Sequence, residues 1–400
     1  TVTAVTQGAG TPTAFSSTGS SYPEHIGATF DSSNNKVIVS YRDQNNSNYP
    51  TVVVGTVSGT SISFGTPVVV NSANSYYTAV TFDSNENKVV VAYQDVGNSQ
   101  KGTAKVGTVS GTSISFGSSA VFEGGATYNI VATFDSNSNK VVICCTDGSD
   151  SNKGKATVAT VSGTSISYGT PVEFHSGETQ STNSVTFDSN SNKVVIAYND
   201  NTNNRIAAVV GTVSGTSISF GSATEVDSTQ GDGMSVCFDS TNNKIIVAYK
   251  AGTGDAGGPG RARVGTVSGT SISFGAVATF FSTAIGIWGN AAAYDVSQQK
   301  VVIIFSDRAS PKKGRAVVGT VSGTSITFTS ATEVESTQVY WPFAVYDSSS
   351  NKTVLGWSAG SGSSMGGEAA VFSIASTDAG SYIGVAAAAI SDSATGSITI

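Results

Sequence analysis

The chain repeats one ten-residue segment so closely that its fold must place equivalent structures along most of its length. The segment GTVSGTSISF begins at Gly55 and returns unchanged at Gly107, Gly211 and Gly265, with near-copies from Ala159 and Gly319. A second motif, FDSxxNK in its commonest form, runs in step with it, about 50 residues apart, from Phe30, Phe82, Phe134, Phe187, Phe238, Tyr294 and Tyr346. Internal repeats of this length are typical of solenoids and propellers.

Composition and pattern both predict an all-β chain. Val, Ile, Thr, Ser and Gly are abundant, whereas Leu355 is the only leucine. Each repeat divides into four extended segments, which in the second copy are residues 77–82, 88–93, 102–109 and 113–116. The segment 88–93 (KVVVAY) is an unbroken apolar run, as expected for a strand buried on both faces. Four antiparallel strands per repeat without a helix predict a propeller blade, because a solenoid coil usually takes fewer residues.

The repeated decamer predicts the outer half of each blade, namely a third strand, a tight turn and a fourth strand. Its Ser-Gly-Thr turn places a glycine where a two-residue hairpin requires a positive φ. These glycines are Gly59, Gly111, Gly163, Gly215, Gly269 and Gly323. Because outer strands meet the same neighbours in every blade, we expect one sequence to serve all of them.

The two ends of the repeat region predict how a ring would close. Residues 10–15 (GTPTAF) match 65–70, the end of a fourth strand, and the last copy has three strands but no decamer after them. We therefore expect a seven-bladed β-propeller of four-stranded antiparallel blades over residues 1–376. The N-terminal strand at 10–15 would complete the last blade and remove the open edges. Residues 377–400 would form a C-terminal connector or the start of a small β-rich module.

The copies differ mainly in one set of loops. In a propeller, the turns between strands 1 and 2 and between strands 3 and 4 open on one face, and both are nearly constant here. The loops between strands 2 and 3 and the connections between blades open on the opposite face. They diverge, from RDQNNSNYP at 42–50 to KAGTGDAGGPGR at 250–261. Loops on a rigid scaffold commonly carry function, so we predict that this loop-rich face binds a ligand.

The loop-rich face also holds the aromatic residues that the repeat does not explain. The candidate ligand-binding residues are Tyr22, His25, Tyr76, Tyr77, Tyr128, Trp288, Tyr340 and Trp341, and the other histidine, His175, is on this face too. Rings beside Asn, Asp, Gln and Ser suit a carbohydrate, whose apolar face stacks on a ring while its hydroxyls form hydrogen bonds. The alternative is that these rings fill the central channel or pack between blades.

Metal and thiol chemistry receive little support. The turn 135–139 (DSNSN) alternates oxygen side chains as a calcium loop does, but it lacks the Gly and the bidentate Glu of such a loop. An Asx-type turn with Asn in the left-handed region explains the same residues. Cys144, Cys145 and Cys237 replace apolar or small residues of the repeat, which predicts buried core thiols rather than a metal or redox site. We expect no metal and no cofactor.

Catalysis also receives little support. Two histidines leave little room for a hydrolytic triad. Acidic pairs on the loop-rich face, such as Asp227 with Asp232 or Glu333 with Glu335, would suit a glycosidase in principle, but solvated loops have the same composition. The signatures of sialidase, WD40 and kelch propellers are missing from the sequence. We therefore expect a protein that is not an enzyme.

Charge and hydropathy exclude two classes of partner. Only 12% of residues are charged, the net charge is -7, and the basic residues are scattered, so we do not expect nucleic acid to bind. No apolar run approaches the 18 or so residues that span a bilayer, so we expect no membrane insertion. The chain begins at Thr1, with no signal-peptide pattern, which predicts a processed protein or a fragment.

The segment 382–396 (YIGVAAAAISDSATG) resembles sequences in structural proteins of tailed phages that infect marine bacteria. In that family, Ile-Gly-Val/Ile-Ala-Ala stretches ending in Ala-Thr-Gly begin small β-rich modules of fibres or decoration proteins. The tandem GTVSGTSISF repeats also look like phage appendage sequence, although bacterial surface proteins share such repeats. The resemblance implies a virion structural protein and carries over no functional residues.

These observations predict a non-catalytic virion fibre or appendage protein whose propeller is displayed outside the cell. Its loop-rich face would bind host-surface polysaccharide, and several copies per particle would multiply weak sugar contacts. The expected partners are the polysaccharide, other virion or fibre subunits and further copies of this chain in a homo-oligomer. The alternatives are a purely structural or decorating protein of a virion or bacterial surface with no ligand, and a polysaccharide-degrading enzyme.

Overall fold

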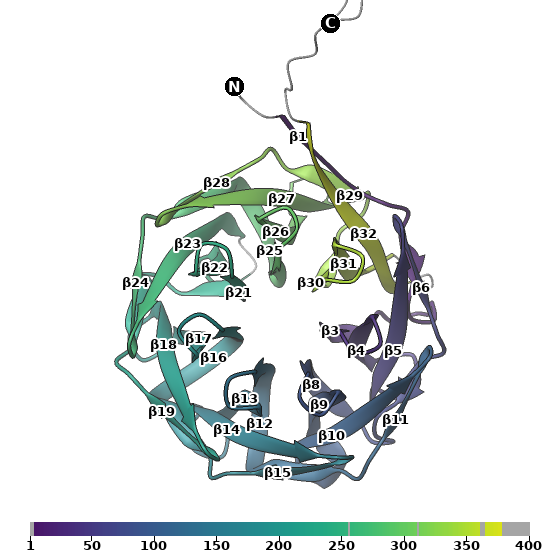
Figure 1. Cartoon of the computed structure of the whole chain (residues 1–400), viewed down its shortest axis with the longest axis vertical. Helices are drawn as coiled ribbons and strands as arrows, with labels where there is room; N and C mark the ends of the chain where they lie inside the picture. Colours follow the sequence, from purple (N-terminus) through teal and green to yellow (C-terminus); the bar gives the residue numbers. More distant parts are fainter. Residues whose placement is uncertain (1–3, 255–256, 310–311, 361–364, 378–400) are drawn as a thin grey trace, which may run out of the picture.

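Antiparallel β-strands make up nearly all of the regular structure, which confirms the all-β prediction. The computed structural model describes residues 4–254, 257–309, 312–360 and 365–377. Within these ranges the only helical element is a 3-10 turn, η1 (Val96–Asn98). No helix in this part of the chain is long and apolar enough to cross a membrane. The strands form groups that follow one another around a common axis (Figure 1).

The first strand group sets the pattern for the others. β3 (Glu24–Asp31), β4 (Lys36–Asp43), β5 (Tyr49–Ser58) and β6 (Ser61–Phe64) pair in this order, each antiparallel to the next. The short β7 (Val68–Val69) then returns to pair with β5. The FDSxxNK motif therefore makes the turn between the first two strands, and the decamer makes the outer hairpin, as predicted.

The same order of pairing recurs along the chain. The second and third groups are β8 (Ser75–Asp83), β9 (Lys88–Asp95), β10 (Lys101–Ser110), β11 (Ser113–Phe116), β12 (Ala120–Asp135), β13 (Lys140–Asp147), β14 (Lys153–Ser162) and β15 (Ser165–Tyr168). Next come β16 (Val172–Asp188), β17 (Lys193–Asp200), β18 (Arg205–Ser214), β19 (Ser217–Phe220), β20 (Thr224–Asp227), β21 (Gly231–Asp239), β22 (Lys244–Ala251), β23 (Gly258–Ser268) and β24 (Ser271–Phe274). β25 (Ala278–Asp295), β26 (Lys300–Asp307), β27 (Lys313–Ser322), β28 (Ser325–Phe328) and β29 (Thr332–Glu335) follow. The long strands β12, β16 and β25 each pair with two groups and so join neighbouring groups into one sheet.

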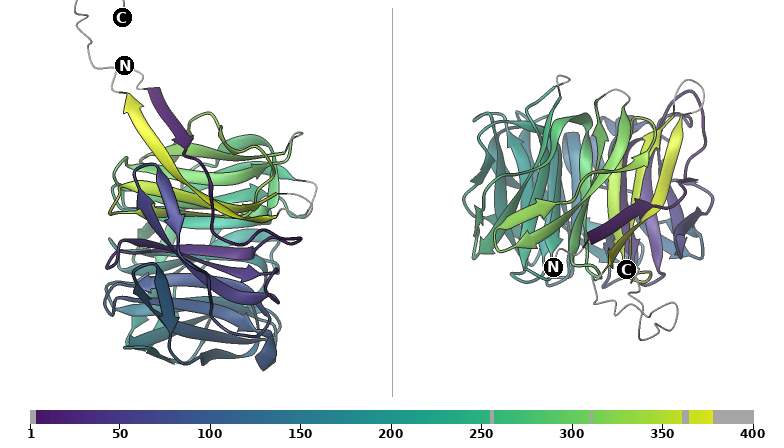
Figure 2. Two further views of the ribbon diagram at one scale, coloured as in Figure 1. Left: turned by 90° about the vertical axis from the view of Figure 1, so that its right-hand side faces the viewer. Right: turned by 90° about the horizontal axis from the view of Figure 1, so that it is seen from above.

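The two ends of the described chain meet in one sheet. β30 (Tyr340–Asp347), β31 (Lys352–Ala359) and β32 (Gly366–Thr377) pair in order. β1 (Ala4–Ala9) pairs with the outer part of β32, and β2 (Thr13–Ala14) pairs with its beginning. Figure 2 shows β1 and the end of β32 running out from the ring together.

The location of the added N-terminal strand was predicted only in part. Residues 10–15 contain just the two-residue β2, which corresponds to β7, whereas the longer partner of β32 is β1, before this range. The match between 10–15 and 65–70 identified the residues that follow a fourth strand, and β1 (AVTQGA) shares no letters with the SISF segments. Residues 378–400, most of the predicted connector, lie outside the described residues.

Both constant turns have the predicted conformation. The Asp135 Oδ1 atom accepts hydrogen bonds from the backbone N–H groups of Asn137 and Ser138, each 2.9 Å long, and Asn139 has φ 54°. This is the Asx-type turn, in which the carboxylate oxygen that a calcium loop would offer to the ion is bonded to the backbone. Gly59 in the hairpin turn has φ 62°.

The core lies between neighbouring strand groups, and the second strands are buried on both faces. In β9, Val89, Val91 and Tyr93 pack toward the first group, whereas Val90 and Ala92 pack toward the third. All five are fully buried, which explains why this strand is apolar at every position. The three cysteines are buried free thiols, as predicted.

Each group approaches the next so closely at one point that only glycine fits. A Cβ atom on Gly65, which follows β6, would lie 2.0 Å from the carbonyl oxygen of Thr112 in the hairpin turn of the next group. The contact recurs for Gly117 with Thr164, Gly169 with Thr216, Gly221 with Thr270, Gly275 with Thr324, and Gly10 with Thr60. The exception, Thr329, faces the last group, whose outer strand is β1 and has no such turn. Its hydroxyl donates a 3.0 Å hydrogen bond to Gln7 Oε1 instead.

We predict that Gly169→Ala lowers the free energy of unfolding by about 1–3 kcal/mol, because the added methyl group would force two backbones apart. The methyl carbon would lie 1.7 Å from Thr216 O. Gly124→Ala is the matched control, since Gly124 lies in a strand with nothing within 4 Å of the added atom. Urea unfolding of both variants measures the effect. Equal stability of the two variants would show that the junction relaxes freely.

Candidate functional site

The structure brings most of the predicted aromatic residues together. We call the following seven the aromatic arc: Tyr22, His25, Tyr76, Tyr77, Tyr128, Tyr340 and Trp341. They lie at or just before the beginning of β3, β8 and β30 and in the middle of β12. Ring-to-ring contacts link five of them through His25 and Tyr77, and Tyr22 contacts Tyr340. The side chain of Trp288, in β25, lies outside the described residues.

His25 is the centre of the arc. Its ring centroid is 4.2 Å from that of Trp341 in the last group and 4.6 Å from that of Tyr77 in the second group. Tyr77 in turn contacts Tyr128 of the third group, with the centroids 6.1 Å apart. The arc therefore runs from the last strand group across the first and second groups to the third.

Tyr22 and Tyr340 form the one stacked pair of the arc. Their ring centroids are 5.1 Å apart and their planes differ by 4°. Tyr22 comes from the connection before β3 and Tyr340 from the start of β30, so the pair also bridges the first and last groups. Two parallel phenol rings present apolar surface with a hydroxyl at each edge.

A β-bulge at equivalent places in several first strands positions these rings. The register shifts after Glu24 in β3, after Tyr76 in β8 and after Tyr340 in β30. The next residue has a left-handed backbone each time, with φ of 48° at His25, 54° at Tyr77 and 49° at Trp341; Asn129 in β12 (50°) and Gly233 in β21 (55°) occupy the same place. Positive φ is rare for bulky residues, and bulges commonly re-aim side chains beside functional sites.

Hydrogen bonds between neighbouring groups hold the bulges. The hydroxyl of Thr78, which follows the bulge residue of β8, donates a 2.5 Å hydrogen bond to the carbonyl oxygen of His25. Asn290 in β25 donates in the same way to the carbonyl oxygen of Gly233. At His25, the strained position in the first group is therefore fixed by a residue of the second group.

Arg42 fixes one edge of the arc. Its guanidinium group lies 4.1 Å from the centroid of the Tyr76 ring and forms a 2.5 Å ion pair with Glu24. Arg42 is buried, whereas Tyr76 is 38% exposed and is one of the few exposed large apolar side chains. The cation–π contact orients the Tyr76 ring while leaving part of its surface open to a ligand.

His25 and the hydroxyls of Tyr22 and Tyr77 are neutral at physiological pH. Burial, with a smaller contribution from the charge of Arg42, lowers the pKa of His25 to about 3. Burial also raises the pKa of the Tyr22 and Tyr77 hydroxyls. A neutral imidazole and neutral phenols donate and accept hydrogen bonds without attracting ions, which suits an uncharged ligand that carries hydroxyl groups.

Sequence reasoning missed a ring of buried polar residues at the penultimate position of each second strand. They are Arg42, Gln94, Thr146, Asn199, Lys250, Ser306 and Ser358. Gln94 donates to Thr127 O (2.8 Å), Asn199 donates to Gly231 O (2.6 Å), and each of these bonds reaches the next group. These residues were predicted from the sequence to begin the variable loops between strands 2 and 3. That prediction was wrong, because each second strand continues through its residue of this set. Their constant spacing after the Lys of the FDSxxNK motif was the available signal.

His175 does not join the arc. Its Nε2 atom lies 3.2 Å from Asp200 Oδ1, and Arg205 Nε donates a 3.0 Å hydrogen bond to Asp200 Oδ2. Burial lowers the pKa of His175, although the carboxylate of Asp200 opposes this shift. His175 packs against Tyr198 at 5.1 Å, so it belongs to the wall of the fourth group.

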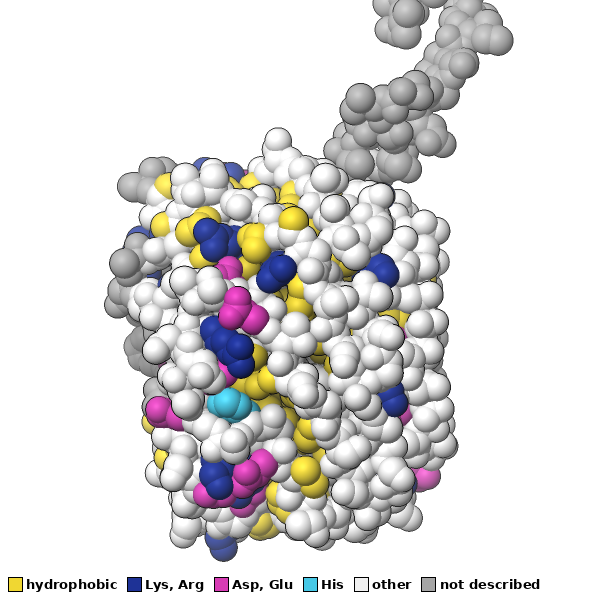
Figure 3. All heavy atoms as spheres, turned by 90° about the vertical axis from the view of Figure 1, so that its left-hand side faces the viewer, with side chains coloured by type: hydrophobic (Ala, Val, Ile, Leu, Met, Phe, Trp, Pro, Cys, Tyr) yellow, Lys and Arg dark blue, Asp and Glu magenta, His cyan; other side chains and the backbone are white. Residues whose placement is uncertain are grey.

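Of the acidic residues considered for catalysis, Asp227, Asp232 and Glu333 each pair with a different basic residue, and Glu335 accepts hydrogen bonds from Ser336 and Thr337. Asp227 accepts a 2.7 Å hydrogen bond from the Tyr249 hydroxyl and lies 3.3 Å from Arg261, whereas Asp232 lies 3.3 Å from Lys250. Glu333 pairs with Lys313 at 2.5 Å. In the part of the chain that the structure describes, no three His, Cys, Asp or Glu side chains form a group that could hold a metal ion. Figure 3 shows charges of both signs gathered near one edge of the ring wall, and much of the remaining wall is uncharged.

Comparisons with known proteins show the fold and not a family. No protein-family model matches the chain, and no curated protein sequence matches it. The BP39L lectin from Burkholderia pseudomallei is similar in structure, with a TM-score of 0.59 and 12% identity over 87% of this chain and 99% of that one. A variant of AofleA from Arthrobotrys oligospora has a TM-score of 0.51 and 9% identity, over 83% of this chain and 93% of that one. NanB solved with Optactamide matches less well, with a TM-score of 0.48 and 13% identity, over 90% of this chain and 70% of that one. At these identities the likeness to the BP39L lectin and to AofleA shows a shared β-rich repeat fold.

We predict that His25 makes the protein less stable in acid. Below pH 6.5, the ordinary pKa of histidine, the unfolded chain gains a proton that folded His25 does not accept until about pH 3. Stability should therefore fall as the pH falls, by about 2 kcal/mol from this residue between neutral pH and about pH 5. His25→Asn should remove this part of the acid sensitivity, because Asn129 already occupies the equivalent bulge with φ 50°. Urea unfolding of both proteins at the two pH values measures the loss in the free energy of unfolding. An equal loss in the wild type and in His25→Asn would contradict the lowered pKa of His25.

Proposed function

We propose that the protein is a carbohydrate-binding protein that holds a neutral glycan on the aromatic arc. The observation that carries the proposal is the set of ring contacts that joins aromatic side chains of the first, second, third and last strand groups through His25 and Tyr77. Pyranose rings bind by stacking an apolar face on an aromatic ring and by hydrogen bonding to neutral polar groups. The arc offers both, since it combines aromatic rings with the neutral imidazole of His25 and the hydroxyls of Tyr22 and Tyr77. The likeness of the fold to that of a lectin supports the proposal.

The architecture behind the site is, in this proposal, a seven-bladed propeller completed by the N-terminal strand. Several contacts between the first and last strand groups support it. β1 and β2 pair with β32, β30 contacts β3, and Gly10 meets Thr60 as the equivalent glycines meet their neighbours. Ser358 also donates a hydrogen bond to the carbonyl oxygen of Pro23.

The biological setting is, in the same proposal, a virion fibre or appendage outside the cell, with host-surface polysaccharide as the ligand and no chemistry on it. The resemblance of 382–396 and of the tandem repeats to phage structural sequences supports this setting. The separate ion pairing of Asp227, Asp232 and Glu333 supports binding without catalysis. Other fibre subunits and further copies of the chain would then be its partners, and weak single-site affinity would be multiplied.

A purely structural role is the second candidate, and one observation favours it. His25 contacts both Tyr77 and Trp341, and all three are only partly exposed, so these rings also pack the junctions between groups. The better exposed ring, Tyr76, and the stacked pair of Tyr22 and Tyr340 distinguish the two roles, because packing alone does not require them.

We predict that Tyr76→Ala combined with Tyr340→Ala weakens glycan binding by at least about tenfold, since two stacking contacts are lost. Binding of the purified protein to a panel of bacterial envelope polysaccharides, with the products checked for cleavage, measures this. Tyr346→Ala is the control, because this tyrosine lies at the opposite end of β30 and bonds Asn351.

Saturable binding that the double variant loses and the control keeps would support the proposal, provided that the glycan stays intact. Cleavage of the glycan by the wild-type protein would indicate an enzyme instead of a binding protein. Failure of the wild-type protein to bind any polysaccharide in the panel would leave the structural role as the better account.

A further inference from the structure

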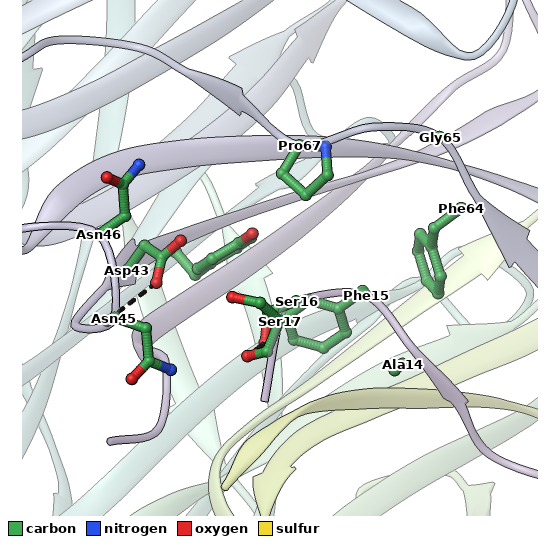
Figure 4. Close-up of a pocket in the computed structure, with 11 residues that line it drawn as sticks. Ala14, Phe15, Ser16, Ser17, Asp43, Asn45, Asn46, Phe64, Gly65 and Pro67 are labelled. Atoms are coloured by element: carbon green, nitrogen blue, oxygen red, sulfur yellow. Dashed lines mark hydrogen bonds between the residues drawn. The ribbon is translucent and has the colours of Figure 1, made fainter. Parts of the chain in front are cut away.

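A second candidate site lies beside the first strand group and shares no residue with the aromatic arc. It is a cavity of about 470 Å³, bounded by residues that follow β2, by the end of β4 and by residues from the end of β6 onward. The rings of Phe15, Tyr41 and Phe64 provide its apolar lining, and Ser16, Asp43 and Asn45 provide polar groups (Figure 4). A cavity of this size admits a small organic molecule.

Asp43 is a buried carboxylate at this cavity. The residue is 8% exposed, and its Oδ1 atom accepts a 3.1 Å hydrogen bond from the backbone N–H of Asn45. Burial raises its pKa above the usual range, although backbone hydrogen bonds from Asn45 and Asn46 oppose the shift. Within the described residues no lysine or arginine pairs with it. A buried carboxylate without a cation is costly, and a cationic ligand would reduce that cost.

Two other strand groups supply such a cation from the chain itself. Asp147, at the end of β13, bonds Lys155 Nζ at 2.5 Å, and Asp307, at the end of β26, bonds Arg315 Nε at 2.6 Å. Lys155 lies opposite Cys145 and Arg315 lies opposite Phe305, two positions before each aspartate. These groups show that the position beside the aspartate accepts an ammonium or a guanidinium group.

The first group has a threonine where these cations would be. Thr51 lies opposite Tyr41, two positions before Asp43, in the register that Lys155 and Arg315 occupy in their own groups. The shorter side chain of Thr51 does not reach across to the carboxylate as a lysine does. The second group has the same combination, Asp95 with Thr103, which makes it a useful comparison.

The Tyr41 hydroxyl is a second group that lacks a partner at the cavity. Tyr41 is fully buried, and its oxygen has no hydrogen-bond partner among the described residues. The equivalent Tyr249 bonds the carboxylate of Asp227 at 2.7 Å, whereas the hydroxyls of Tyr93 and Tyr198 at the same position also lack a partner among the described residues. Burial raises the pKa of Tyr41, so the group stays a neutral hydroxyl. A bound molecule would satisfy it, as buried polar groups usually require.

We propose that this cavity binds a small organic cation, an ammonium or guanidinium group on a compact carbon skeleton. The cationic group takes the place that Lys155 and Arg315 fill in their own strand groups and bonds Asp43. The carbon skeleton packs on Phe15 and Phe64, and the Tyr41 hydroxyl accepts from or donates to the ligand. Charge-assisted hydrogen bonds to a buried carboxylate select a cation over a neutral molecule of the same shape.

Cyclohexylammonium and cyclohexanol form a matched pair of probes for calorimetric titration at neutral pH, because they share a ring and differ in charge. We expect saturable binding of cyclohexylammonium, with cyclohexanol at least about tenfold weaker. Asp43→Asn should abolish the preference for the cation. Thr51→Lys should abolish binding, because it rebuilds in the first group the arrangement of Asp147 with Lys155, and should raise the melting temperature.

Thr103→Lys is the matched control, because it makes the same change beside Asp95 and leaves the Asp43 cavity intact. Binding that survives in this variant assigns the site to the first group. Loss of binding in Thr103→Lys but not in Thr51→Lys would overturn that assignment. Equal binding of the two probes, no binding of either, or unchanged selectivity in Asp43→Asn with a native circular dichroism spectrum would overturn the proposal. None of these outcomes bears on polysaccharide binding at the arc.

Discussion

The close approach between neighbouring strand groups is the constraint on which the rest of the structure depends. After most outer hairpins a glycine lies against the Thr carbonyl group in the hairpin turn of the next strand group. The sequence of the decamer is therefore constrained by contacts between repeats as well as by contacts within each repeat. Thr329 supports this explanation from the opposite direction, because a side chain appears where the next group has no such turn. One close contact therefore recurs at most of the junctions between neighbouring groups.

The outer hairpins are nearly constant in sequence, whereas the side chains at the bulges of the first strands vary from group to group. The first strands contact one another around the axis, and their bulges present whichever residue the sequence places there: His25, Tyr77, Asn129, Gly233 or Trp341. The backbone conformation is the same at all of these positions, whereas the side chains differ in size and polarity. Aromatic residues occupy this place mainly in the groups near the chain ends, so the arc is a local use of a repeated framework.

Much of the fold follows from the sequence, because short-range chemistry decides it. The Asx turn at Asp135, the positive φ of Gly59 and the apolar run of β9 need only their own neighbours. The bulges, the buried Gln94 and Asn199, and the cavity at Asp43 depend on which groups meet across a junction. The aromatic residues were identified as candidates because they do not fit the repeat. Their contacts through His25 could not be predicted, because these contacts depend on how the first, second and last strand groups are arranged around the axis.

The pairing of β1 with β32 has a mechanical consequence. Ala4 lies opposite Thr377 at the outer end of the pair, and Ala9 lies opposite Phe372 nearer the ring. A force that pulls these two chain ends apart would load the hydrogen bonds of the pair one after another, as a zipper opens, instead of all at once. Such geometry gives way at low force, whereas a load passed through the ring by neighbouring groups would meet whole packed interfaces. The pairing of β1 with β32 would therefore separate before the packed interfaces between neighbouring strand groups do.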